Sequence, residues 1–247
     1  MLNEIIEKKT IEARAIVAFY PCNSNEDDDI EIYDENDGKT LKGKWCTLRQ
    51  QLDKDQDNFV AMSDFIAPKK NGVTDYVGFF ACSAGFNQDE VCKKYVEEGD
   101  DYNNMMVKTL TDRLAEALAE KLHEDVRKDM WGYAPDEDLS VADMLNVKYQ
   151  GIRPAPGYPS QPDHTEKSTM WKMMNVFEDS GIELTESLAM NPASSVCGLY
   201  FAHPHSHYFA VDEICKDQVE SYSTRKEMPK KDIEKWLSPI LSYEAEE

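Results

Sequence analysis

The residues with the clearest potential for chemistry lie in a proline-rich segment, Arg153-Pro154-Ala155-Pro156-Gly157-Tyr158-Pro159-Ser160-Gln161-Pro162, which we call the ribbon. Its four prolines fix φ and remove backbone donors, so we expect a stiff extended track and neither an interior helix nor a central strand. Arg153 can clamp a carboxylate, Tyr158 can stack or donate a hydrogen bond, and Gly157 lets a ligand approach the backbone. This pattern favours a small ligand with a carboxylate and an apolar or aromatic part. A rigid surface loop has the same composition and stays an alternative.

A histidine repeat, His203-x-His205-x-His207, is the second candidate site. Alternate residues of a strand share a face, so three imidazoles on a strand can converge on a metal ion. Pro204 interrupts the strand pattern, and the local sequence offers no carboxylate to orient the ligands. We therefore expect solvated turn histidines and no metal, with a zinc-dependent enzyme as the alternative.

Two further groups could take part in binding. Tyr208 and Phe209 are adjacent on an expected strand, so one ring can pack in the core while the other lines a groove, unless both are core residues. Asp112 and Glu116 lie four residues apart on an expected helix and could dock a basic partner face. Nearby lysines make an ordinary solvated face the simpler interpretation. The sequence contains no phosphate-binding glycine loop and no nucleophile elbow.

Hydrophobic periodicity predicts the elements that must position these residues. We expect helices over 2–11, 101–131, 163–181, 216–227 and 230–237, and strands over 13–20, 30–32, 41–48, 75–84, 183–190, 196–202 and 207–214. Asp37-Gly38 predicts the turn of a hairpin, and Asp100 predicts the N-cap of the long helix. Asp163 and Glu166 form a capping-box pattern, and Gly181 is a plausible C-terminal cap. Hairpins without regular βαβ alternation predict an α+β fold: a single domain with a bent, mainly antiparallel sheet flanked by helices.

Composition limits the classes of function. The chain has 247 residues, 27 basic and 48 acidic, for a net charge of −21, which disfavours nucleic acid as a partner. No apolar run is long enough to span a bilayer, and acidic residues near the N-terminus exclude a signal peptide, so we expect a cytoplasmic protein without a membrane partner. The six cysteines show no C-x-x-C pair, so we expect reduced, structural thiols.

Several segments together resemble a known family. They are Leu48-Arg49-Gln50-Gln51, Asp64-Phe65-Ile66-Ala67-Pro68, Asp112-Arg113-Leu114-Ala115-Glu116-Ala117, the ribbon with His164-Thr165-Glu166-Lys167, Leu184-Thr185-Glu186-Ser187 and Asp217-Gln218-Val219-Glu220. In this order, from about Ala13 to Tyr243, they are similar to the activation domain of cobalamin-dependent methionine synthase. Ordered agreement over so many segments is far more specific than a single motif.

The resemblance implies a function that the residues alone do not indicate. Domains of this family bind S-adenosyl-L-methionine (AdoMet) and support reductive methylation of cob(II)alamin to methylcobalamin. The implied partners are the cobalamin-binding domain of methionine synthase and a flavodoxin-type electron donor. The domain is thus part of a methyltransferase and is not expected to be catalytic alone. A docking module for a cobalamin or flavodoxin-like partner, without AdoMet binding of its own, is the alternative.

The resemblance also implies residue roles. Arg153 matches the arginine that holds the AdoMet carboxylate, Tyr158 matches the tyrosine of the same R-x-x-x-G-Y motif, and Gly157 precedes it. Tyr208 and Phe209 fall at the aromatic pair that lines the AdoMet site.

Two departures bear on these expectations. Family members carry an upstream aspartate in an Asp-Trp-x-Pro-Phe-Phe-like segment that contacts AdoMet. We therefore expect one activation-like domain over 1–247 that is N-terminally truncated relative to the family. The sequence has no Asp-x-His-x-x-Gly motif, so cobalamin would be held by a partner domain.

Overall fold

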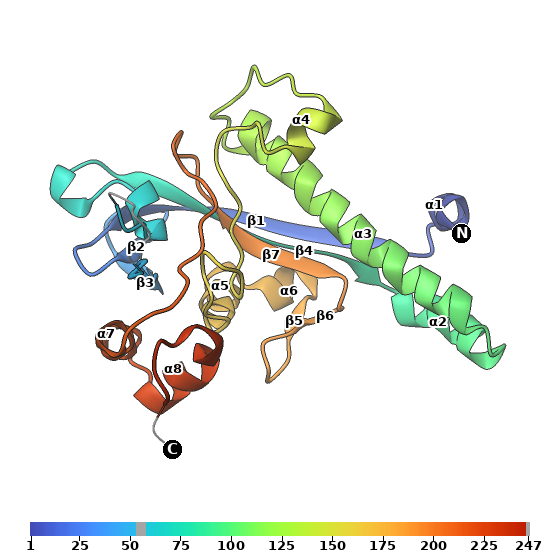
Figure 1. Ribbon diagram of the computed structural model, residues 1–247. Helices are drawn as coiled ribbons and strands as arrows, with labels where there is room; N and C mark the ends of the chain where they lie inside the picture. Colours follow the sequence, from blue (N-terminus) through green and yellow to red (C-terminus); the bar gives the residue numbers. More distant parts are fainter. Residues whose placement is uncertain (53–57, 246–247) are drawn as a thin grey trace. The chain divides into compact units, whose positions relative to one another are not determined.

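The computed structural model describes residues 1–52 and 58–245 (Figure 1). The chain forms two compact units. Unit 1 contains Met1–Val17, Phe80–Asp138 and Met174–Cys197, and unit 2 contains Ala18–Phe79, Leu139–Met173 and Gly198–Glu247. Three strands begin in one unit and end in the other: β1 (Glu12–Ser24), β4 (Asp75–Phe86) and β7 (Ser195–Tyr200).

The main sheet has five strands in the order β3-β2-β1-β4-β7. β2 (Asp29–Tyr33) pairs antiparallel with both β1 and β3 (Leu41–Cys46). The turn between β2 and β3 is the expected one. Gly38 has a φ of 62°, and the Asp37 carboxylate accepts hydrogen bonds of 2.8 Å from the backbone N–H groups of Lys39 and Thr40. The predicted hairpin and the α+β class with a mainly antiparallel sheet are confirmed.

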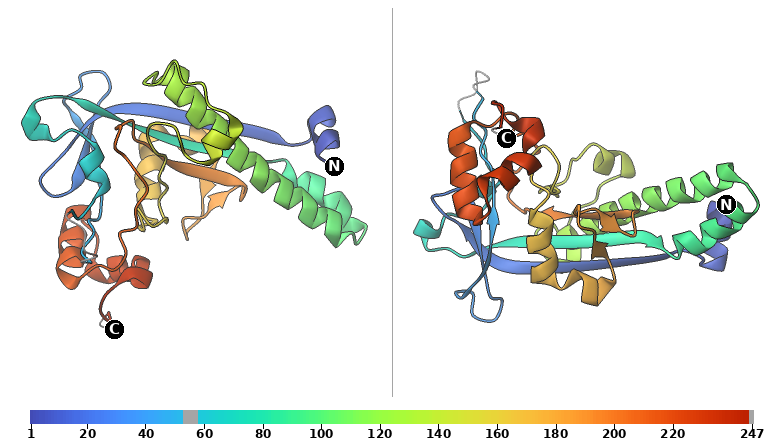
Figure 2. Two further views of the ribbon diagram at one scale, coloured as in Figure 1. Left: turned by 45° about the horizontal axis from the view of Figure 1, so that its top comes forward. Right: turned by 90° about the horizontal axis from the view of Figure 1, so that it is seen from below.

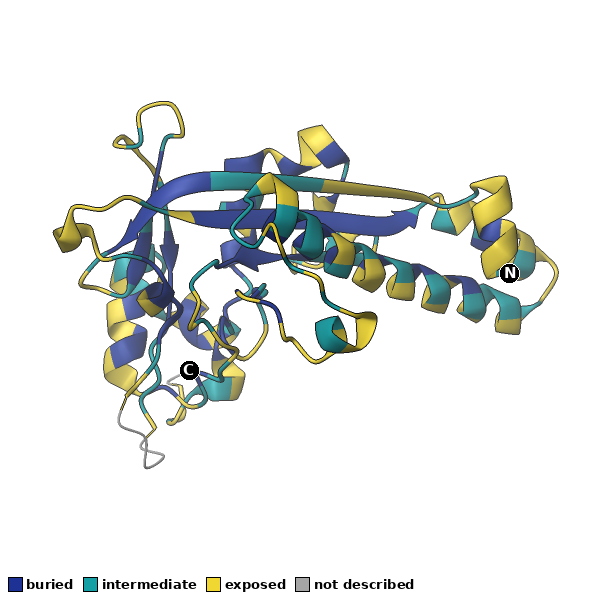
Figure 3. Ribbon diagram, turned by 90° about the horizontal axis from the view of Figure 1, so that it is seen from above, coloured by how far each residue is buried: buried dark blue, intermediate teal, exposed yellow. Residues whose placement is uncertain are grey.

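Burial changes along β1, whose apolar residues cluster toward its C-terminal half. Its first four residues are exposed, the next four are half-buried and the last five are buried, as the change from yellow to blue in Figure 3 shows. Within unit 1 the sheet consists of parts of β1, β4 and β7, so β1 is the edge strand there. The exposed end of β1 is therefore a sheet edge at which polar side chains such as Glu12 and Arg14 are tolerated.

The helices of unit 1 are α1 (Leu2–Lys8), α2 (Gln88–Glu97), α3 (Asp101–Asp125) and α6 (Val176–Ser180), with a π-helical turn, η3 (Val126–Met130), after α3. The predicted long helix is confirmed as α3 with η3. Asp100 is its N-cap and accepts a 3.0 Å hydrogen bond from the Asn103 backbone N–H, which lowers the pKa of Asp100. Packing between α2 and α3 buries Cys92 and Val107. α2 is a helix that the periodicity did not predict.

The helices of unit 2 are α4 (Val141–Leu145), α5 (Glu166–Met174), α7 (Lys216–Lys226) and α8 (Lys230–Trp236), with 3-10 turns η1 (Met62–Phe65), η2 (Lys69–Asn71) and η4 (Ser238–Ile240). The red helices α7 and α8 lie side by side in both views of Figure 2, as predicted for 216–227 and 230–237. They cover a core cluster formed by Cys46, Leu48, Val211, Ile214, Val219, Tyr222, Ile233 and Leu237.

The helix predicted over 163–181 is wrong as a single element. Asn175 adopts a left-handed conformation, with a φ of 51°, and separates α5 from α6; Gly181 caps α6 as expected. The predicted capping box is also wrong. The Asp163 carboxylate accepts from the N–H of Thr165, two residues on, and Glu166 pairs with Lys226 of α7.

Two of the predicted strands do not form as continuous strands, because the backbone turns in one and lacks hydrogen-bond donors opposite the other. The segment 183–190 is a short hairpin, β5 (Glu183–Leu184) with β6 (Met190–Asn191), because Leu188 turns the chain with a φ of 60°. The segment 207–214 is irregular. It faces the ribbon, whose prolines have no N–H groups, so a continuous ladder of hydrogen bonds cannot form.

All six cysteines are free thiols, and Cys215 alone is exposed. Burial raises the pKa of Cys46 to about 12, and the Glu166 and Asp29 carboxylates add to this shift. Because thiolates are the reactive form, we expect iodoacetamide to modify one thiol rapidly in the native protein and six after denaturation. Mass spectrometry would check this, with Cys215→Ser as the control that removes the rapid reaction. Rapid labelling of a second cysteine in the native protein would contradict the buried positions.

Among the described residues, no helix has both the length and the apolar character needed to cross a bilayer.

Candidate functional site

The ribbon is held at its start by β7. Ile152, just before the ribbon, exchanges two backbone hydrogen bonds with Phe201, of 3.1 and 3.0 Å, and the Leu199 N–H donates to the Pro154 carbonyl at 2.9 Å. Pro154 accepts here and has no N–H to donate. The start of the ribbon is therefore extended, and Arg153 lies between two paired residues, but the extended track predicted for the whole ribbon is wrong because the chain turns after Pro154.

A tight turn follows in the ribbon. The Gly157 N–H donates to the Gln161 carbonyl at 2.7 Å, and the Gln161 N–H donates to the Tyr158 carbonyl at 2.9 Å. This turn places Tyr158 at the surface, with 67% of the residue exposed. Gly157 has a φ of +92°, a conformation that side-chain-bearing residues rarely adopt. A Cβ atom there would lie 2.0 Å from Cε1 of His164, so the imidazole fills the space that we expected a ligand to approach.

The guanidinium of Arg153 is oriented by a phenol. Its Nη1 donates to the Tyr149 hydroxyl at 2.9 Å, and Tyr149 is buried. This bond orients the guanidinium, whose planar fork of donors suits recognition of a carboxylate. The Arg153 backbone N–H donates to the Tyr208 hydroxyl at 3.0 Å. The structure thus brings together Arg153 and Tyr208, which lie 55 residues apart in sequence.

Tyr208 and Phe209 divide as expected, although not on a strand. Tyr208 is 47% exposed, whereas Phe209 packs against the core cluster of unit 2. The Phe209 N–H donates to the Ser160 hydroxyl at 3.2 Å, and the Val211 N–H donates to the Pro159 carbonyl at 2.9 Å. These bonds attach the aromatic pair to the far end of the ribbon. All five predicted ligand-site residues therefore lie on two connected segments of unit 2.

The histidine repeat belongs to an aromatic cluster. The Phe65 ring lies 6.2 Å from the His203 ring, 5.5 Å from the His207 ring and 6.2 Å from the Phe209 ring, between centroids. The His203 Nδ1 accepts from the His205 N–H at 3.2 Å. Within residues 1–52 and 58–245, no group of three or more His, Cys, Asp or Glu side chains is placed to hold a metal ion.

Asp112 and Glu116 are exposed on α3, but both have partners within unit 1. Asp112 accepts a 2.6 Å hydrogen bond from the Ser194 hydroxyl, and Glu116 forms a 2.7 Å ion pair with Arg113. Arg113 therefore offsets the charge of Glu116, whereas the Ser194 hydroxyl that bonds to Asp112 is neutral.

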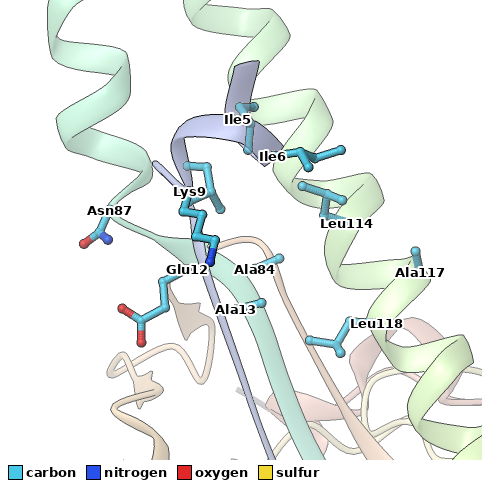
Figure 4. A pocket seen from close by; sticks show the side chains of 11 residues that line it. Ile5, Ile6, Lys9, Glu12, Ala13, Ala84, Asn87, Leu114, Ala117 and Leu118 are labelled. Atoms are coloured by element: carbon cyan, nitrogen blue, oxygen red, sulfur yellow. The ribbon is translucent and has the colours of Figure 1, made fainter. Parts of the chain in front are cut away.

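Unit 1 also contains a pocket of about 690 Å³ between α1, β1, β4 and α3 (Figure 4). Its lining is mostly apolar, with Lys9 and Glu12 as its charged residues, and includes none of the predicted site residues. The lining residues are Ile5, Ile6, Lys9, Ile11, Glu12, Ala13, Ala84, Asn87, Leu114, Ala117 and Leu118.

A buried polar network behind the ribbon escaped sequence reasoning. Lys226 lies between Asp163, at 3.1 Å, and Glu166, and all three side chains are at least 92% buried. The Tyr222 hydroxyl donates to Asp163 at 2.8 Å. Burial raises the pKa of Glu166; burial alone would lower that of Lys226, but the two carboxylates outweigh it and raise the pKa. One signal in the sequence could have indicated that Lys226 is buried. Lys226 lies one helical turn after Tyr222 and therefore shares the buried face of α7.

Comparison with known proteins places this geometry in context. The model of a family described as "Vitamin B12 dependent methionine synthase, activation domain" matches residues 1–227. A crystal structure of the MetH reactivation domain bound to AdoHcy is similar to this chain, with a TM-score of 0.96 and 47% sequence identity. The similarity covers 99% of this chain and 75% of that chain. The ribbon and the segment 208–211 lie within the part matched by the family model.

Proposed function

This chain belongs to the family of vitamin B12-dependent methionine synthase activation domains, and we propose that its ribbon binds AdoMet for reactivation of the cobalamin enzyme. Arg153 holds the carboxylate of the ligand. Tyr158 presents an exposed phenol near the sulfonium, and Tyr208 and Phe209 line the remainder of the site. The observation that supports this proposal is the bond between the Arg153 backbone N–H and the Tyr208 hydroxyl, which holds the start of the ribbon beside the exposed phenol of Tyr208.

The chemistry of AdoMet fits these residues. Its carboxylate suits the planar fork of a guanidinium, and its sulfonium is attracted to aromatic faces. The net charge of −21 also favours a cationic ligand over an anionic one. The similar domain was solved with AdoHcy, which is AdoMet after loss of its methyl group, so a site that accepts one accepts most of the other.

When bound, AdoMet supplies a methyl group to the reduced cobalamin of another domain and leaves as AdoHcy. The residues of this chain bind and orient the donor so that its methyl group faces that domain. We further propose that the acidic face of α3 around Asp112 and Glu116 contacts the cobalamin-binding domain, and that a flavodoxin-type protein supplies the electron.

Isothermal titration of the 247-residue chain with AdoHcy and with AdoMet tests the proposal. We expect saturable binding of both ligands at a single site, and competition between them. Adenosine, which lacks the carboxylate, is the control and should bind more weakly. Absence of saturation by both ligands up to about 1 mM, equivalent to less than about 4 kcal/mol of binding, would overturn the proposal. Binding of a cobalamin domain without any AdoHcy dependence would instead indicate a docking module.

A further inference from the structure

The imidazole of His164 lies against the backbone of the ribbon at Gly157. An added Cβ atom at Gly157 would lie 2.0 Å from Cε1, 2.5 Å from Nδ1 and 2.6 Å from Nε2 of the imidazole. The ring edge therefore lies directly against the Gly157 backbone. The next residue is Tyr158, whose position depends on the Gly157 conformation because the two share a peptide bond.

The imidazole is itself held in place from behind. Its ring lies 6.3 Å from the Trp236 ring, at the end of α8. The neighbouring residues Asp163 and Thr165 are buried and bonded to one another, and Asp163 is tied to α7 through Tyr222 and Lys226. The position of His164 is therefore set by the helix pair α7 and α8, and the ribbon rests on it.

We propose that His164 is a positioning residue for the ligand: its ring fills the space beside Gly157 and so holds the turn that presents Tyr158. This inference rests on the proposed AdoMet site. Without the ring, the space beside Gly157 opens, and a glycine with no side chain has many other conformations available. The Gly157 to Gln161 hydrogen bond would then break more often, and the ligand would have to order the turn when it binds.

The role assigned to the ring is steric, so its charge should be unimportant. Burial lowers the pKa of His164, and the Lys167 ammonium lowers it further, against the opposing effect of Asp163. The imidazole is thus neutral near pH 7. A neutral ring adds no positive charge beside a cationic ligand, and a phenyl ring of similar width should perform the same task.

Two substitutions in the full chain separate this role from general stability. His164→Ala should weaken AdoHcy binding about tenfold, whereas His164→Phe should stay within about threefold of the wild type. In the ligand-free protein, hydrogen exchange of the Gly157 amide should speed up in His164→Ala and not in His164→Phe. A general loss of packing would not be rescued by the phenyl ring of His164→Phe. It would also not speed up exchange at the Gly157 amide alone.

The contrary outcomes are distinct. If wild type binds AdoHcy and His164→Ala binds equally well, or if both variants lose binding to the same extent, the positioning role is wrong while the AdoMet site stands. If wild type fails to bind, both proposals fall. A double-mutant cycle with Gly157→Ala gives an independent check, because the added methyl group clashes with the ring only when the ring is present. Strict additivity of the two substitutions would also overturn the inference.

Discussion

Replacing Arg153 by alanine should weaken AdoHcy binding about 30-fold, or about 2 kcal/mol, the usual contribution of hydrogen bonds to a charged group. The guanidinium is fixed by the Tyr149 hydroxyl and is the cation that the ribbon offers to a carboxylate. Arg153→Lys keeps the charge but loses the two-pronged geometry, so its affinity should lie between those of alanine and wild type. Titration calorimetry measures all three affinities.

The matched control for this prediction is Arg113→Ala. Arg113 is an exposed arginine of α3 that pairs with Glu116, and it lies in unit 1. Its removal should leave AdoHcy affinity unchanged. Equal affinity of wild type and Arg153→Ala would show that the ligand carboxylate binds elsewhere. An equal loss in both variants would point to a general effect of net charge and not to a site.

The largest effect on folding should come from Lys226→Met, which we expect to lower the free energy of unfolding by about 3–5 kcal/mol. The substitution leaves Asp163 and Glu166 buried without their cation, and a buried unpaired charge is costly. The same substitution at Lys121, which pairs with Asp125 on the exposed side of α3, should cost less than about 1 kcal/mol. Urea unfolding monitored by circular dichroism measures the free energy of unfolding of both variants and of the wild type.

The pH dependence of this effect follows from Glu166. Burial raises its pKa above the ordinary value of 4.5 in the folded protein. Such a group favours the folded state at low pH, and this contribution is lost as pH rises through the folded pKa. Without Lys226 the pKa should rise further. The deficit of Lys226→Met relative to wild type should therefore shrink as pH falls from 7 toward 4.5.

A variant that neutralises the whole network separates charge from packing. Asp163→Asn, Glu166→Gln and Lys226→Met together remove every charge of the set, so most of the lost stability should return. If the triple variant is as unstable as Lys226→Met alone, the lysine acts through its apolar stem and not through its charge.

Periodicity predicted most of the regular elements because their spacing is local. The apolar run at 16–20 predicted the strand β1, and the spacing of leucines and alanines over 107–126 predicted the helix α3. The break between α5 and α6 was missed because it depends on one left-handed asparagine inside a continuous apolar pattern. The helix α2 was missed because its apolar residues are few and become informative only against α3.

The candidate site could be proposed from the sequence in part for the same reason. Arg153, Gly157 and Tyr158 stand out in sequence because proline-rich segments are rare and their chemistry is local. The residues that hold this segment in place were not predictable from the sequence. No pattern marks Tyr149 as a partner of Arg153, and Lys226 has the sequence context of an ordinary exposed lysine. Its partners Asp163 and Glu166 lie some 60 residues away, and only the packing of α7 reveals them. The contacts of the histidine repeat with Phe65 were not predictable, because a metal site and a ring cluster share one sequence pattern.

The hydrogen bonding of the ribbon to β7 has one more consequence, for self-association. β7 stands at the end of the strand order, where a bare backbone would template the addition of a foreign chain and the growth of fibrils. Leu199 of β7 and Phe201 just after it are already hydrogen-bonded to Pro154 and Ile152, and the prolines farther along the ribbon have no N–H group to donate to an added strand. We therefore expect the ribbon, which we propose binds the ligand, also to disfavour the addition of a foreign strand at this edge.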